Sequence, residues 1–140
     1  MPHTYKAARV VFLCDRFTHH YPIMESLGLR LLQREPEDQD VKRLLADILS
    51  SSDLPGDRDL AVRYTAELAK QFPDDPRIYL LKGAVEGGLA LADSSTAHAQ
   101  ACIAYYRQYL AAEPSGSPDA QLIGLHIQIV NGWISKWSKQ

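Results

Sequence analysis

Three short phrases that each end in proline recur along the chain at nearly even intervals. The phrases are LLQREP, LAKQFP and YLAAEP, and their prolines at positions 36, 73 and 114 lie 37 and 41 residues apart. Each phrase closes a stretch with helical hydrophobic spacing, where proline ends a helix because it lacks a backbone N–H and clashes with the preceding turn. A recurrence near this period indicates stacked helical units that share one core.

Hydrophobic spacing and helix-start signals predict an all-α chain. The predicted helices cover residues 5–17, 22–34, 39–51, 57–71, 76–92, 95–112 and 118–137. Their proposed capping residues include Asp57, Asp75, Ser94 or Ser95, and Ser117, whose side chains can accept a free backbone N–H. No segment alternates apolar and polar residues between turn dipeptides, so we expect no strands.

Charge and length exclude several classes of function. The chain has 140 residues, which suits one domain, and its net charge of −2 comes from 15 basic and 17 acidic residues. Nucleic-acid binding is not expected, because it needs a strong basic excess. The apolar run Val10–Cys14 is too short for a secretion signal or a membrane span, so we expect a cytoplasmic protein with no membrane contact.

The sequence contains no motif that predicts catalysis, a metal site or a cofactor. Cys14 and Cys102 are far apart in apolar patterns and are expected to be buried, reduced thiols. His19 and His20 are adjacent, so on a helix their side chains would point about 100° apart. We interpret the histidines as surface or capping residues and expect a protein that is not an enzyme.

Residues 76–114 carry the most specific pattern. Tyr79 is a bulky residue followed four positions later by the small Gly83, Cys102 and Tyr106 supply a small and an aromatic residue on the next helix, and Pro114 closes the unit. This pattern resembles the tetratricopeptide repeat (TPR) family, in which each unit is a pair of antiparallel helices. A small residue at a helix crossing lets two backbones approach, and an aromatic ring fills the space beside it.

The other two units resemble the family less closely. Residues 40–73 keep the small Ala61 and the closing Pro73, but Thr65 replaces the aromatic residue. In residues 5–36, Phe12 stands where a small residue is expected and Gly28 where an aromatic one is expected. The resemblance implies a single domain with a right-handed superhelix of about three antiparallel helix pairs and a C-terminal helix. The expected pairs are residues 5–36, 39–73 and 76–114, and the terminal helix is 118–137.

The resemblance also implies a binding surface. In the family, the first helices of the pairs line a concave groove that holds an extended peptide or a partner helix. The residues expected to bind a partner on this face are Lys42, Arg43, Arg77, Lys82 and Glu86. Cations on these helices could hold the carboxylates of a partner. The alternative is an ordinary solvated helix face, and these helices lack the asparagine of the lysine–asparagine clamp found in chaperone-binding members.

The final predicted helix is unusually apolar for the end of a stacked array, which should carry a polar outer side. It contains two tryptophans one turn apart, Trp133 and Trp137, among many aliphatic residues. One stripe can pack on the preceding pair, and exposed apolar patches commonly mark contacts. We expect this helix to mediate homodimer formation or to dock a partner. The alternative is a helix folded more deeply into the core.

The leading hypothesis is a non-catalytic interaction scaffold or adaptor that binds a protein or peptide through its concave face. A secretion or assembly chaperone, or a structural protein that self-associates through its C-terminal helix, is the first alternative. The second alternative is a helical domain that binds a small ligand or acts as an enzyme. A concave face lined by cations would favour the adaptor, and a closed apolar pocket with buried titratable groups would favour the ligand-binding domain.

Overall fold

The computed structural model describes residues 4–14, 21–113 and 116–139, and this part of the chain is all-α. Its helices are α1 (Tyr5–Cys14), α2 (Tyr21–Arg34), α3 (Gln39–Ser50), α4 (Pro55–Gln71), α5 (Arg77–Asp93), α6 (Thr96–Ala112) and α7 (Pro118–Trp137). The prediction of an all-α chain is confirmed for these residues, and the helix ends that can be compared agree within two residues. Residues 15–17 of the first predicted helix, and Pro114, lie outside the described residues.

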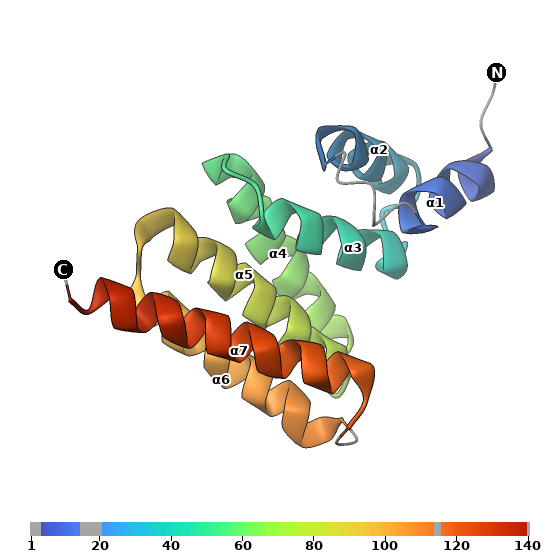
Figure 1. The fold of residues 1–140 in the computed structure, drawn as a ribbon. Coiled ribbons are helices and arrows are strands. Elements are labelled where there is room, and N and C mark those ends of the chain that lie inside the picture. The colour runs from blue at the N-terminus through green and yellow to red at the C-terminus, as the bar shows by residue number, and fades with distance from the viewer. Residues whose placement is uncertain (1–3, 15–20, 114–115, 140) are drawn as a thin grey trace.

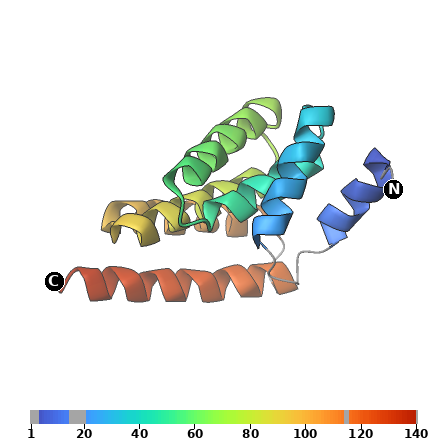
Figure 2. The ribbon, with the colours of Figure 1, turned by 90° about the horizontal axis from the view of Figure 1, so that it is seen from above.

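Each helix packs against the next one along the chain, and α3 also contacts both α1 and α5. Helix α7 packs along α6, and Figures 1 and 2 show it as a long rod at one side of the molecule. The N-terminal and C-terminal ends lie at opposite ends of the helix array (Figure 1). The arrangement leaves the side of α5 between α3 and α7 open.

Serine caps fix the starts of α6 and α7. Ser95 Oγ accepts the backbone N–H of His98 at 3.2 Å, and Ser117 Oγ accepts that of Ala120 at 3.0 Å. Ser94, the other proposed cap, instead ends α5 in the left-handed conformation with a φ of 49°. The two adjacent serines therefore divide the sharp turn between α5 and α6, one closing a helix and the other opening the next.

The start of α4 differs from the expectation. Asp57 does not cap this helix, because Leu54 occupies the capping position without a side-chain bond and Pro55 lies in the first turn. The Asp57 carboxylate accepts the Ser52 hydroxyl at 2.7 Å instead. Proline needs no partner for a backbone N–H, so the helix begins two residues earlier than predicted.

The core consists of three apolar clusters that meet on α5. Val85 joins the cluster of α1 to α4, Ile78 and Leu81 join residues of α3 and α4, and Ala90 joins the cluster of α6 and α7. The largest fully buried side chains are Phe12, Val41, Leu45, Leu49, Leu68 and Cys102. Helix α5 is therefore the element on which both halves of the molecule depend for burial of apolar surface.

Glycine and an aromatic ring fit together in two of the helix pairs. Gly83 of α5 lies against the Tyr106 ring of α6, where a Cβ atom would overlap the ring. In the first pair the sides are exchanged: Gly28 is on the second helix, and a Cβ there would lie 2.9 Å from the Phe12 ring of the first helix. The departure of residues 5–36 from the expected pattern is thus the same ring-against-glycine contact with its partners swapped.

The C-terminal end of α3 approaches α5 most closely at Gly88. A Cβ atom on Gly88 would overlap the backbone carbonyl of Ser50, whereas one on Gly87 would make an ordinary contact of 3.4 Å with Cys102 Sγ. Gly88 therefore permits the two backbones to meet.

Two further expectations concern the surface. Cys102 is buried as expected, but Cys14 is exposed, because α1 presents Val10, Val11 and Cys14 outward while Phe12 enters the core. None of the described helices combines the length and apolar character needed to cross a bilayer.

Candidate functional site

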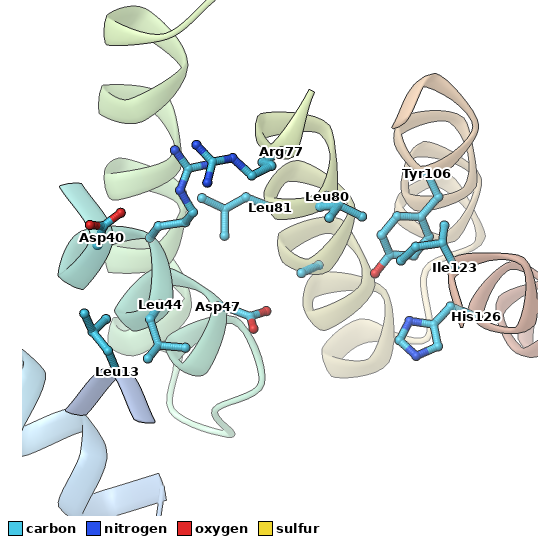
Figure 3. A pocket seen from close by; sticks show the side chains of 12 residues that line it. Leu13, Asp40, Leu44, Asp47, Arg77, Leu80, Leu81, Tyr106, Ile123 and His126 are labelled. Atoms are coloured by element: carbon cyan, nitrogen blue, oxygen red, sulfur yellow. The ribbon is translucent and has the colours of Figure 1, made fainter. Parts of the chain in front are cut away.

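A cavity of about 550 Å³ lies between α3, α5 and α7. Five helices contribute to its walls, with Leu13 of α1 and Tyr106 of α6 at its two sides (Figure 3). The lining residues are Leu13, Asp40, Arg43, Leu44, Asp47, Arg77, Leu80, Leu81, Ala84, Tyr106, Ile123 and His126. A smaller apolar opening of about 370 Å³ lies between α1 and α2 and involves that pair alone.

A second cavity of about 360 Å³ continues from the first along α5. The two share four lining residues, which are Asp47, Ala84, Tyr106 and His126. The second cavity extends past Gly87 and Gly88 to Leu91, and Trp133 of α7 lines its other side. We call the two connected cavities the trough. Its elongated course along one helix suits a chain segment better than a compact molecule.

Two predicted site residues, Arg43 and Arg77, lie at the end of the trough near the start of α5. Both guanidinium groups bind Asp75 Oδ2, at 3.3 Å from Arg43 and 3.0 Å from Arg77. The hydrogen bonds from Arg77, followed by the charge of Arg43, hold the pKa of Asp75 below its usual value. Nε and Nη1 of Arg43 are buried without a hydrogen-bond partner among the described residues. These two arginines thus share one internal carboxylate.

Asp40, on the same end of the trough, is also neutralised from within. Arg9 of α1 binds Asp40 Oδ2 at 2.7 Å and Asp38 Oδ2 at 2.7 Å. Tyr5 donates its hydroxyl to the same Asp38 oxygen. Burial alone would raise the pKa of Asp38, but the bonds from Arg9, Tyr5 and the Val41 backbone outweigh it and lower that pKa. This network fastens α1 to the start of α3.

The middle of the trough brings together Asp47, Tyr106 and His126 from three different helices. Figure 3 shows the Asp47 carboxylate reaching from α3 toward the cavity, with the Tyr106 hydroxyl and the His126 ring on the opposite side. The Tyr106 and His126 rings are tilted against each other with centroids 6.1 Å apart. Burial raises the pKa of Tyr106, and the charge of Asp47 adds to that effect, so the hydroxyl stays protonated.

The Asp47 carboxylate has an unusual environment for an aspartate. The cavity walls remove part of its hydration, which raises its pKa, and the nearby His126 acts in the opposite direction. The side chain is nevertheless exposed at the mouth of the trough, so the loss of hydration is partial. Among the described residues, no side chain forms a hydrogen bond with the Asp47 carboxylate. The Ser50 hydroxyl donates instead to the Asp47 backbone carbonyl, at 2.6 Å.

Three predicted site residues do not line the trough. Lys42 Nζ binds Glu67 Oε2 of α4 at 3.1 Å, Lys82 lies over the Tyr105 ring of α6, and Glu86 Oε2 is 2.6 Å from His98 Nδ1. All three therefore face the second helix of their own pair. The structure therefore does not bring them together with Arg43 and Arg77 in the trough.

The two predicted tryptophans lie at the C-terminal end of α7. Trp133 and Trp137 are half-buried against the α6–α7 core, and their ring centroids are 5.8 Å apart. Trp133 lines the second cavity, whereas Trp137 is absent from the described cavities. The tryptophans thus serve mainly to pack α7, and Trp133 alone is placed to touch an occupant of the trough.

Aliphatic side chains, rather than the tryptophans, form the exposed apolar surface of α7. Leu122, Leu125 and Ile129 are 51%, 55% and 55% exposed. At about 100° per residue they fall within an arc of about 60° on the helix. Ile123 and Val130 on the core side are buried, so α7 is covered on one side only, and the alternative of a deeply buried terminal helix is contradicted.

The described residues contain no group of three or more histidine, cysteine, aspartate or glutamate side chains placed to hold a metal ion. His19 and His20 lie outside the described part. Burial raises the pKa of Cys102 to about 11, which keeps its thiol protonated and unreactive near neutral pH.

Tyr106 and His126 were not among the residues that we expected to bind a partner. The sequence assigned Tyr106 to packing and His126 to the surface. A signal for His126 was present, since it lies seven residues before Trp133 and three after Ile123, and therefore shares the inward side of α7. No comparable signal distinguishes a packing tyrosine from one whose hydroxyl reaches a cavity.

Comparison of the chain with protein-family models, with curated proteins and with solved structures finds no match. An interpretation of function must therefore start from the trough itself.

Proposed function

We propose that this chain is a non-catalytic interaction scaffold or adaptor that docks a peptide or a helix of a partner protein in the trough. The observation that carries this proposal is the open, elongated cavity of about 550 Å³, continued by a second of about 360 Å³, between α3, α5 and α7. The first cavity has mostly apolar walls and a few convergent polar groups, which is the usual form of a binding site. The second cavity adds a polar stretch that includes Ser50, Ser51 and Ser52.

The helix order supports a finer interpretation. Odd-numbered helices form most of the trough walls, and α3 contacts both α1 and α5. A TPR-like right-handed superhelix with its first helices on the concave side would place them in this way. In helix-in-groove binding, an apolar stripe on the partner is removed from water between two helices, so the hydrophobic effect favours the complex.

A selection of peptides that bind the full chain tests this proposal. We expect selected peptides to perturb backbone amide signals of α3, α5 and α7, and to lose at least tenfold in affinity with Leu80→Arg, which places a charge in the trough wall. Val62→Arg is the matched control, because Val62 is exposed on α4 and lines neither cavity of the trough. Equal binding to both variants, or perturbations confined to other helices, would contradict the proposal.

A second candidate function is self-association through α7, and the exposed stripe of Leu122, Leu125 and Ile129 favours it. From Ala120 to Ser135 the helix carries no Asp, Glu, Lys or Arg, so two copies could meet without like-charge repulsion. A structural or chaperone role built on a dimer would use this surface.

A further inference from the structure

Three aspartates and three arginines line the trough, but they do not pair one to one. Asp40 is neutralised by Arg9, and Arg43 and Arg77 share Asp75. In the adjoining cavity Asp53 and Arg58 carry opposite charges. Asp47 remains, because no side chain of the described residues forms an ion pair or hydrogen bond with its carboxylate.

The position of Asp47 indicates what kind of ligand its unpaired carboxylate would attract. Its carboxylate lies at the junction of the two cavities, which both include Asp47, Tyr106 and His126 in their walls. Apolar side chains surround the junction, including Leu44 on the preceding turn of α3 and Leu80 across the cavity on α5. A carboxylate that has lost part of its hydration gains most from a cation that brings its own charge and hydrogen-bond donors.

The three arginines of the trough are less available to an anion, because each already donates to a protein oxygen. Arg58 of the second cavity donates to the Ser52 backbone carbonyl at 3.0 Å. Arg43 already binds Asp75, and its Nε and Nη1 are covered by protein atoms. Arg77 also binds Asp75, through both its side chain and its backbone N–H. An incoming carboxylate would have to displace Asp75 and would then meet Asp40 and Asp47 in the same walls. The chemistry is therefore the reverse of the carboxylate recognition that the sequence suggested.

We propose that the trough selects a partner segment in which a lysine or arginine side chain, flanked by apolar residues, binds Asp47. The inference rests on the proposed docking function and specifies the partner. The cation enters between Asp47 and the Tyr106 and His126 rings, where an aromatic face adds to the attraction of the carboxylate. The flanking apolar side chains lie along Leu44, Leu80 and Ile123.

Three ligands with the same chain length and different head groups test the proposal. Hexylguanidinium, 1-hexanol and hexanoate are titrated into the full chain at pH 7.5, and the amide signals of Asp47, Ala84 and Tyr106 are followed by NMR. We expect hexylguanidinium to bind most tightly and hexanoate most weakly. Asp47→Asn should reduce hexylguanidinium affinity about three- to fivefold, as expected for one partly exposed ion pair, and leave 1-hexanol unchanged. Asp59→Asn, an exposed aspartate on α4, is the matched control.

The outcomes separate this inference from the proposed function. If hexanoate binds as tightly as hexylguanidinium, or if Asp47→Asn keeps the preference for the cation, the selection of a cation is overturned. Binding of 1-hexanol at the same amides would then still leave the trough as an apolar docking site. If none of the ligands moves these signals, the cation proposal is overturned, and the peptide selection with Leu80→Arg decides on the trough independently.

Discussion

Adjacent residues on one helix can have very different space around them, as two glycines of α5 illustrate. Gly87 and Gly88 differ by one position, yet Gly87 has room for a methyl group beside Cys102 and Gly88 has none beside the Ser50 carbonyl. The difference arises because successive side chains point about 100° apart on a helix. Small residues at close backbone approaches cannot be exchanged without moving a whole helix.

We therefore expect opposite effects from two single substitutions. Gly87→Ala should be neutral or should stabilise the protein by up to about 1 kcal/mol, because alanine has the higher helix propensity. Gly88→Ala should destabilise it by about 1–3 kcal/mol, since the methyl group pushes α3 from α5. Urea denaturation followed by circular dichroism measures both. Equal stability of the two variants would contradict the close contact at Ser50.

The same angular rule explains which site residues could be predicted from the sequence. Lys42 and Arg43 are neighbours on α3, but Lys42 turns to Glu67 of α4 and Arg43 turns to the trough. If the side of α3 that faces the cavity is assigned one residue too early or too late, the expected roles of Lys42 and Arg43 are exchanged. Apolar spacing locates the buried side of a helix, but it does not determine which flank meets its own pair and which meets the next.

At the scale of elements, the helix ends could be predicted well because their signals are local. Ser117 before Pro118 marks the start of α7, because its hydroxyl oxygen accepts the backbone N–H of Ala120. The ring-against-glycine contact of the first pair could not be predicted, because Phe12 and Gly28 must be recognised as partners across two helices. Local chemistry determines where an element begins, whereas pairing between elements depends on contacts that a single sequence does not reveal.

The attachment of α1 to α3 is an element-scale feature with a defined pH dependence. The Asp38 pKa lies below the unfolded value of 3.8, so the contribution of this carboxylate to stability is complete above pH 3.8. It is lost as the pH falls through the lower folded value. We expect Asp38→Asn to destabilise the protein by about 1–2 kcal/mol at pH 7, because an amide cannot hold Arg9 as strongly.

Thermal unfolding of both proteins between pH 7 and pH 2.5 checks this expectation. The difference in stability should shrink as the pH falls from 3.8 toward the lower folded pKa, because Asp38 takes up a proton in the unfolded chain before it does so in the folded protein. Asp59→Asn, at an exposed aspartate of α4, is the matched control and should leave the stability at pH 7 unchanged. A difference between Asp38→Asn and wild type that stays constant down to pH 2.5 would show that the charge of Asp38 does not matter.

For the molecule as a whole, the exposed stripe of α7 predicts concentration-dependent association. We expect sedimentation equilibrium to show a dimer that Leu125→Lys abolishes, because a lysine on the stripe would be buried without a partner between two copies. Leu80→Arg, which alters the trough and not the stripe, should leave the association unchanged. A strict monomer at high concentration would exclude self-association and leave the trough as the candidate contact surface.

Because α5 contributes to all three core clusters and also forms the floor of the trough, the heat stability of the whole chain should report occupancy of the trough. A ligand that binds only the folded form, present at a concentration one hundred times its dissociation constant, adds about 2.7 kcal/mol to the free energy of unfolding. Because residues of α5 also bury apolar surface in each cluster, a ligand held on α5 should stabilise the helices that pack on it. A simple melting-temperature screen of peptides can therefore identify occupants before any partner protein is known.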